Sequence, residues 1–172
     1  MSDLRFLLVS GMSGSGKTIA LQALEDLGYY CIDNLPAELI PSLANNLQNR
    51  VAVSLDDAIN RCAVSVDVRN RQFLTDLPEH LKSLVSLQIP YSVLFLDAEQ
   101  AVLVSRYSET RRKHPLTNSN TSLLEAIDLE RGLLAPLAEL ADRQLDTTQT
   151  TPHELRAVVR DFAGGISSAP LS

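Results

Sequence analysis

Short apolar runs alternate along this chain with longer segments in which apolar residues recur at helical spacing. Each run has the length of a buried strand, and each longer segment has the period of an amphipathic helix. The runs predict strands at 4–9, 29–33, 62–66, 91–96 and 144–146. The helical patterns lie at 19–27, 39–47, 77–88, from 98 onward, at 123–141 and at 152–162. This alternation predicts a three-layer α/β domain with a mostly parallel five-stranded sheet.

Several predicted helix ends carry local capping signals. Gly28 is placed to end the first helix as a C′ glycine. Asp76 stands three residues before Glu79, and Thr151 stands three residues before Glu154, which is the spacing of a capping box. Helices are therefore expected to begin just after Asp76 and Thr151.

Other positions predict irregularities. Gly132 and Pro136 should bend or split the helix at 123–141. Residues 50–61 have a weaker pattern and are expected to form a surface excursion. The buried face of the helix at 77–88 is predicted to comprise Leu77, Leu81, Leu84, Val85 and Gln88.

Length and composition bound the class of protein. The 172 residues are expected to form one domain over 1–163, followed by a disordered tail at 164–172. Apolar residues make up 45% of the chain, as in a soluble globular protein. No apolar run approaches the ~20 residues of a membrane span, and no signal peptide is expected before the first strand. Cys31 and Cys62 are expected to be small buried hydrophobes, so the chain is expected to be cytoplasmic.

The first strand and first helix enclose the motif G-x-x-x-x-G-K-T, a phosphate-binding loop. Its residues are Gly11, Met12, Ser13, Gly14, Ser15, Gly16, Lys17 and Thr18. Glycines allow backbone N–H groups to surround phosphate oxygens, and the helix directs its positive end at the same anion. Lys17 is expected to contact the β- and γ-phosphates and to act in catalysis, and the Thr18 hydroxyl to bind Mg²⁺.

Three acids follow predicted strands, where open parallel sheets bind their ligands. They are Asp33, Asp67 and Asp97, and any of them could serve the magnesium side of the site. Asp33 could instead cap the segment that begins at Pro36, and Asp97 could cap the helix that follows it. The pattern leaves the choice among the three acids open.

A polar connection follows the third predicted strand. It consists of Asp67, Val68, Arg69 and Asn70. Arg69 could hold a phosphate through two hydrogen bonds, and Asn70 could contact a base edge with its donor and acceptor. The alternative is an ordinary polar connection between a strand and a helix. Its position at the predicted ligand edge favours a nucleotide-binding role.

One basic stretch interrupts an otherwise acidic chain. Lys and Arg number 15 and Asp and Glu number 21, so the net charge is −6 and RNA is not an expected partner of this chain alone. Arg106, Arg111, Arg112 and Lys113 fall close together. Beside a phosphate loop they suggest a lid that closes on the transferring phosphate, with Arg111 and Arg112 as catalytic cations. The alternative is a solvated charge run in which Glu109 pairs locally.

These stretches together resemble the RapZ/YvcJ-type nucleotide-binding proteins, the RNase adapter protein family. The resemblance extends over residues 5–160 and is carried by 11–18, 28–36, 67–70, 95–98 and 106–116. It implies binding of ATP and GTP with weak ATPase and GTPase activity. It assigns ATP to residues 11–18 and GTP to residues 67–70.

In some members of this family the protein delivers a small regulatory RNA to an endoribonuclease. The resemblance places RNA binding and amino-sugar sensing in a C-terminal domain, and this chain is expected to stop before that domain. We therefore expect a regulatory NTPase domain, with a possible protein partner and an undefined oligomeric state. The alternative is a small-molecule kinase, suggested by the lid-like arginines and by Asp33. The preference between ATP and GTP and the general base stay open.

Overall fold

The structure, a computed structural model, describes residues 4–12, 14–52, 61–66, 76–110 and 123–168. Its strands are β1 (Arg5–Gly11), β2 (Tyr30–Leu35), β3 (Arg61–Val66), β4 (Tyr91–Asp97) and β5 (Arg143–Asp146). They form one five-stranded sheet in the order β2-β3-β1-β4-β5, and every neighbouring pair is parallel. The five predicted strands are therefore confirmed, with small shifts at their ends.

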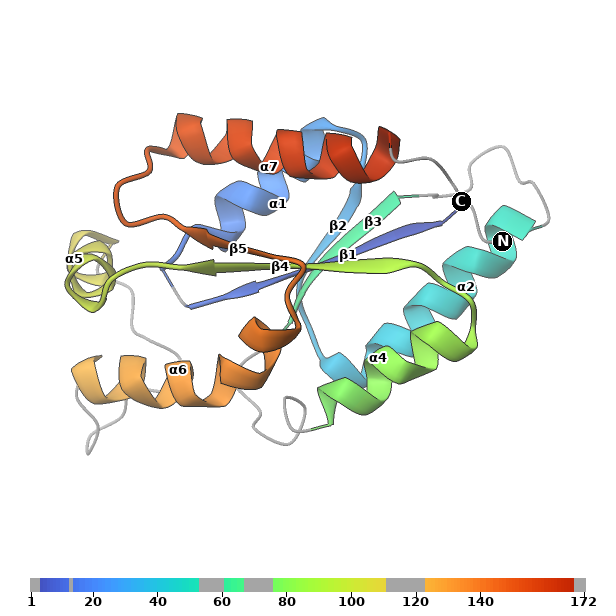
Figure 1. The fold of residues 1–172 in the computed structure, drawn as a ribbon, viewed down its shortest axis with the longest axis horizontal. Coiled ribbons are helices and arrows are strands. Elements are labelled where there is room, and N and C mark those ends of the chain that lie inside the picture. The colour runs from blue at the N-terminus through green and yellow to red at the C-terminus, as the bar shows by residue number, and fades with distance from the viewer. Residues whose placement is uncertain (1–3, 13, 53–60, 67–75, 111–122, 169–172) are drawn as a thin grey trace.

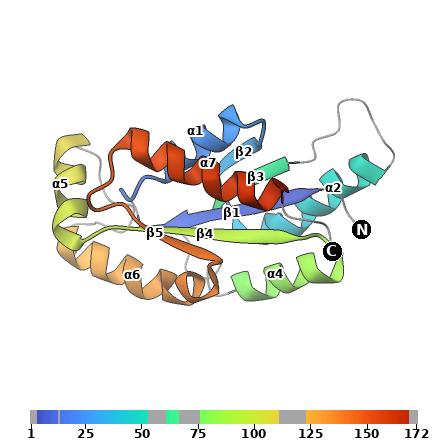
Figure 2. The same cartoon turned by 45° about the horizontal axis from the view of Figure 1, so that its top comes forward.

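Helices cover both faces of this sheet, which confirms the three-layer α/β architecture. They are α1 (Lys17–Asp26), α2 (Ile40–Ala52), α4 (Leu77–Ser86), α5 (Gln100–Thr110), α6 (Leu123–Leu140) and α7 (Pro152–Ser168), with a 3₁₀ turn η1 (Ala37–Leu39) before α2. Figure 1 shows α1 and α7 above the sheet and α2, α4 and α6 below it. Figure 2, turned about the horizontal axis, shows the same division, with α5 beyond the end of β4.

The two faces of β1 belong to two separate hydrophobic clusters. Phe6 and Leu8 pack in the cluster formed with α2, α4 and α6. Leu7 and Val9 pack in the cluster formed with α1 and α7. Because successive side chains of a strand point to opposite faces, a central strand covered on both sides must be apolar throughout. This explains why the first strand reads as a continuous apolar run.

Two predicted caps are present. The Gly28 N–H donates to the Glu25 oxygen and the Tyr29 N–H to the Leu24 oxygen, both at 3.0 Å, and Gly28 has a φ of 92°. This is the Schellman ending of a helix, in which the C′ residue takes the left-handed conformation. At α7, the Glu154 N–H donates to the Thr151 hydroxyl at 3.1 Å, as a capping box requires.

Other predicted helix details were wrong. Asp76 precedes α4, but its side chain makes no capping hydrogen bond. Val85 is 65% exposed, because it lies at the edge of the apolar stripe of a short helix. α6 continues through Pro136 as one helix. Neither Gly132 nor Pro136 splits it, and α6 runs unbroken from Leu123 to Leu140.

The C-terminal helix is longer than the sequence pattern predicts. α7 continues to Ser168, so residues 164–168 are helical rather than a disordered tail. The preceding turns are held by Leu155, Val159 and Ala163 in the core, and a packed helix propagates more easily than it begins. None of the described helices is long and apolar enough to span a membrane.

Candidate functional site

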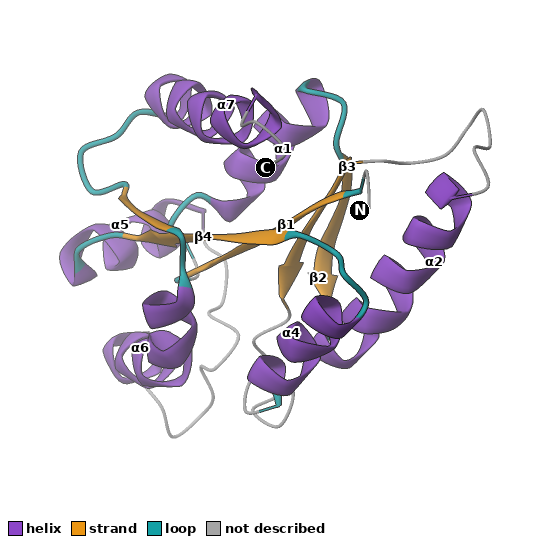
Figure 3. Ribbon diagram, turned by 45° about the vertical axis from the view of Figure 1, so that its right-hand side comes forward, coloured by secondary structure: helices purple, strands orange, loops and turns teal. Residues whose placement is uncertain are grey.

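The phosphate-loop motif lies where β1 ends and α1 begins, at the carboxyl edge of the parallel strands (Figure 3). Gly14 has a φ of 85°, and Gly16, the N-cap of α1, has a φ of 111°. Only glycine adopts such values without strain, so the spacing of glycines in the motif follows from the path of the loop. Lys17 is the first residue of α1, and Ser13 falls outside the described residues.

Two of these glycines also allow close packing. A Cβ at Gly11 would lie 2.3 Å from the Leu96 oxygen of β4, and one at Gly16 would lie 2.6 Å from Leu155 Cδ2 of α7. The Met12 N–H donates to the same Leu96 oxygen at 3.0 Å. The loop is therefore fitted against β4 on one side and α7 on another.

The hydrogen-bond donors of this loop are suited to binding an anion. α1 directs its N-terminal backbone N–H groups at the loop, and the Ser15 N–H closes a tight turn onto the Met12 oxygen at 3.0 Å. Ser15 is fully buried, and among the described side chains its hydroxyl is one of the few buried polar groups without a hydrogen-bond partner. A backbone loop at a helix N-terminus, followed by Lys17 and by the exposed Thr18, fits a phosphate group with Mg²⁺.

Arg106, the first residue of the basic stretch, lies within α5. Its guanidinium donates from Nη1 to the Gly14 oxygen at 2.9 Å and from Nη2 to the Thr147 oxygen at 2.6 Å. It therefore bridges the phosphate loop and the residue that follows β5. The predicted catalytic residues Arg111 and Arg112, with Lys113, lie outside the described residues.

The carboxylate of Asp33, on β2, contacts the neighbouring strand. The Ser65 hydroxyl donates to Asp33 Oδ1 and accepts the Asn34 N–H at 2.7 Å. Asp33 does not cap the segment at Pro36, since η1 has no side-chain capping bond. The sequence reasoning missed Ser65, because Ser65 lies one residue before the end of β3, whereas the acids were chosen at positions where predicted strands end.

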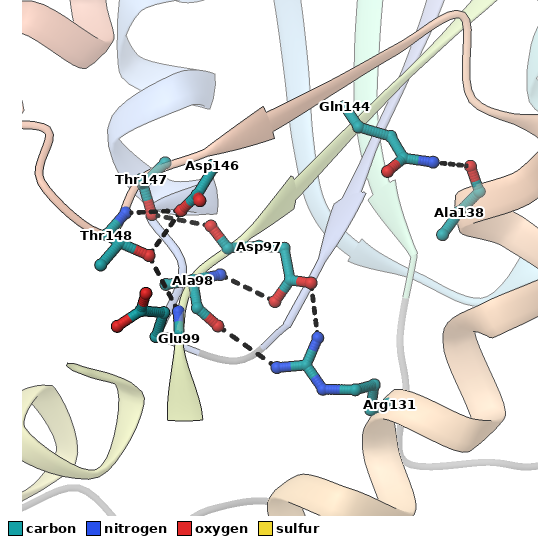
Figure 4. Close-up of polar contacts among 9 residues, drawn as sticks. All are labelled: Asp97, Ala98, Glu99, Arg131, Ala138, Gln144, Asp146, Thr147 and Thr148. Atoms are coloured by element: carbon teal, nitrogen blue, oxygen red, sulfur yellow. Dashed lines mark hydrogen bonds and ion pairs between the residues drawn. The ribbon is translucent and has the colours of Figure 1, made fainter. Parts of the chain in front are cut away.

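Asp97, at the end of β4, has both carboxylate oxygens engaged (Figure 4). Oδ1 accepts the Ala98 N–H at 2.7 Å, and Oδ2 pairs with the Arg131 guanidinium of α6. α5 begins only at Gln100, so Asp97 fixes the start of the connection rather than capping the helix directly. Asp67, Val68, Arg69 and Asn70 lie outside the described residues. Within the described ranges, no three His, Cys, Asp or Glu side chains gather as metal ligands.

The loop after β5 adds a second polar cluster at this edge. Thr148 donates to the Asp146 carboxylate from both its hydroxyl and its N–H, which lowers the pKa of that carboxyl, and the charge of Arg106 lowers it further. The Thr148 hydroxyl also accepts the Glu99 N–H at 2.9 Å (Figure 4). The ends of β4 and β5 are thus joined by a polar network beside the phosphate loop.

Comparison with known proteins gives the chain relatives over nearly its whole length. A family model described as the RapZ-like N-terminal domain matches residues 4–167. A nucleotide-binding protein from Halorhodospira halophila is 50% identical over 166 residues, covering 96% of this chain and 56% of that protein. A second, from Methylococcus capsulatus, is 50% identical over 162 residues, covering 94% of this chain and 54% of that protein. The chain spans about half the length of the curated relatives it matches.

Similar solved structures establish the fold class. Shikimate kinase from Bacteroides thetaiotaomicron has a TM-score of 0.58 at 15% identity, covering 95% of this chain and 98% of that one. Shikimate kinase from Acinetobacter baumannii has a TM-score of 0.54 at 15% identity, covering 98% and 96%. At this identity the likeness concerns the fold alone, and that fold is the P-loop kinase-like α/β fold.

Proposed function

The chain belongs to the RapZ-like N-terminal domain family, and from this premise we propose that it binds ATP and GTP with Mg²⁺ and hydrolyses both slowly. The observation that carries the proposal is the glycine-shaped loop between β1 and α1. Its backbone path, its position at the carboxyl edge of a parallel sheet and the helix N-terminus behind it all suit a triphosphate.

Each residue of the motif has a role in this proposal. Residues 11–18 hold the phosphates of ATP through backbone N–H groups, Lys17 neutralises charge on the β- and γ-phosphates, and Thr18 binds Mg²⁺. The stretch from Asp67 to Asn70 contributes the GTP contacts. Arg111 and Arg112 stabilise charge that develops during phosphate release.

Slow hydrolysis without an acceptor separates a regulatory NTPase from a kinase. Phosphate release from ATP and GTP should be measurable with Mg²⁺ and no added metabolite, and Lys17→Ala should remove most of it. Lys82→Ala is the matched control, since that lysine is an exposed residue of α4 whose side chain is 75% accessible. Release that appears only when one metabolite is added would contradict the proposal.

A small-molecule kinase is the second candidate, supported by the hydrogen bond between Ser65 and Asp33. This hydrogen bond holds the Asp33 carboxylate at the carboxyl edge of the sheet. There the carboxylate could take the proton from the hydroxyl group of a substrate that receives the phosphate. Incubation with radiolabelled ATP and a panel of nucleosides, sugars and hydroxy acids tests this candidate. Transfer of label that is lost in Asp33→Asn would favour the kinase, and absence of transfer across the panel would remove it.

We also propose that this domain acts in the cytoplasm and that it works together with further protein segments. The relatives are nearly twice as long as the match, so contacts with RNA or a protein partner are proposed to involve residues outside this chain. The net charge of −6 supports weak nucleic-acid affinity for the chain itself. Retention of RNA on filters by this chain at physiological salt would contradict this assignment.

A further inference from the structure

Two successive carbonyl groups of the phosphate loop are held from outside by side chains that come from distant parts of the sequence. The Gly14 oxygen accepts Arg106 Nη1 at 2.9 Å. The Ser15 oxygen accepts the Thr147 hydroxyl at 2.7 Å. Arg106 belongs to α5, and Thr147 directly follows β5, so two elements converge on one side of the loop.

Thr147 is itself rigidly placed. Its side chain is 2% exposed, and its backbone N–H donates to the Asp97 oxygen at 2.8 Å. Its hydroxyl accepts Arg106 Nη1 at 3.0 Å while donating to Ser15. The guanidinium charge polarises the hydroxyl, which strengthens the hydrogen bond that Thr147 donates to the loop.

The direction of the Ser15 carbonyl determines where the next N–H points. In a planar trans peptide, the C=O of one residue and the N–H of the following residue point in opposite directions. Since the Ser15 oxygen is held toward Thr147, the Gly16 N–H points away from Thr147. In the proposed function, this is the direction in which the phosphate is expected to lie.

We propose that Thr147 is a positioning residue that orients the phosphate loop for the triphosphate, with Arg106 as its partner. The inference rests on the proposed function, because it concerns how the same loop is prepared for its ligand. Thr147 does not touch the nucleotide in this scheme. It acts through the peptide between Ser15 and Gly16, which it fixes before the ligand arrives.

The test compares Thr147→Val, Thr147→Ser and the parent chain. Valine keeps the buried shape but removes the hydroxyl, and serine restores it. Thr150→Val is the matched control, because Thr150 lies in the same loop and its hydroxyl donates instead to the Asp146 oxygen at 3.3 Å. Affinities are measured for Mg²⁺ with inorganic tripolyphosphate and for Mg²⁺ with a non-hydrolysable ATP analogue. Hydrogen–deuterium exchange of residues 11–18 is measured without ligand.

Thr147→Val should lower the affinity for tripolyphosphate and for the ATP analogue about tenfold each. This is the size of effect expected when a buried carbonyl loses its hydrogen-bond donor. Exchange across residues 11–18 should become faster in the ligand-free protein. Thr147→Ser should recover most of the affinity, and Thr150→Val should match the parent. Equal losses for the two ligands would locate the defect in the phosphate loop rather than at the base.

A folded Thr147→Val protein with parental exchange and parental affinities would overturn the inference. If that variant does not fold, Arg106→Lys provides the second test, since lysine keeps the charge but cannot bridge Gly14 and Thr147 together. It should also weaken tripolyphosphate binding, and parental affinity would count against the inference. A parent chain that binds neither ligand would refute the proposed function, while the exchange comparison would still decide the role of Thr147.

Discussion

The Arg131 guanidinium of α6 pairs with the Asp97 carboxylate at the end of β4 (Figure 4). Arg131 also donates to the Ala98 oxygen at 3.2 Å, so it holds both the side chain and the backbone at this point. A carboxylate with both oxygens occupied in this way is less suited to bind a magnesium-coordinated water. We therefore expect Asp33 or Asp67, rather than Asp97, to serve the magnesium side of the site.

Arg131→Ala should lower the free energy of unfolding by up to about 1 kcal/mol. Removing one partner of a fully buried ion pair would instead cost several kcal/mol. The reason is exposure, because the Arg131 and Asp97 side chains are 42% and 35% accessible. Urea denaturation measures the change. Lys82→Ala, which breaks a much more exposed pair with Glu79, should have almost no effect. A loss above about 3 kcal/mol for Arg131→Ala would mean that the pair supports the core.

Gly16→Ala should destabilise the fold and impair the phosphate loop together. Its φ of 111° is unfavourable for alanine, and the added Cβ would meet Leu155 Cδ2 at 2.6 Å. We expect a loss of about 1–3 kcal/mol in the free energy of unfolding. Gly132→Ala is the control, since its Cβ would meet nothing within 4 Å in α6, and it should be neutral or stabilise by about 0.5–1 kcal/mol. Thermal melts of the two variants that shift equally would refute this account.

The two thiols should be unreactive in the folded protein. Burial raises the pKa of Cys31 to about 11, helped by the nearby Glu25, and burial raises that of Cys62 to about 12. Only the thiolate reacts readily, so iodoacetamide at pH 8 should label both residues in urea and neither in the native state. Mass spectrometry of the alkylated chain gives the result, and rapid native labelling would contradict the burial of these side chains.

The same shifts predict how stability depends on pH. The folded pKa values lie above the ordinary thiol value of 9.0, so the folded chain retains protons that the unfolded chain loses. The contribution is complete below about pH 9 and is lost as the pH rises toward 11 and 12. Urea titrations at pH 8 and pH 10.5 should therefore show lower stability at the higher pH. Cys31→Ala should reduce that difference, and an unchanged difference would assign it to other groups.

Asp67→Ala should lower the affinity for GTP more than the affinity for ATP if the stretch from Asp67 to Asn70 binds the guanine nucleotide. Titration of the variant with analogues of both nucleotides in the presence of Mg²⁺ measures the two losses. Equal losses would instead assign Asp67 to the magnesium side of the site. Asp76→Ala is a suitable control, because that residue stands before α4 and outside the proposed site.

Much of the fold was predictable because its signals are local. The central strand reads as apolar throughout because both its faces are covered, and the ends at Gly28 and Thr151 carry their own capping residues. Gly132 and Pro136 misled the reading of α6, because local helix-breaking signals do not reveal that the helix continues through both residues. The predicted tail at 164–172 began too early, because the length of α7 depends on its packing in the core, which the local sequence does not reveal.

The candidate site was predictable only in its outline. The glycine loop has a motif, but its supports do not, because they are single side chains brought together by the parallel topology. Thr147 lies 132 residues from Ser15, and Ser65 lies 32 residues from Asp33. Strand order must be known before such pairs can be recognised. Inspecting the residues at the carboxyl end of every strand would have drawn attention to Ser65 and Thr147.

The most direct test of the central claim is a calorimetric titration of the purified chain with non-hydrolysable ATP and GTP analogues in the presence of Mg²⁺. The account predicts saturable binding of both analogues by the parent chain and a strong loss of affinity in Lys17→Ala, with the thermal stability of that variant unchanged. Absence of binding by the parent, or parental affinity in Lys17→Ala, would contradict the assignment of this loop as a nucleotide site.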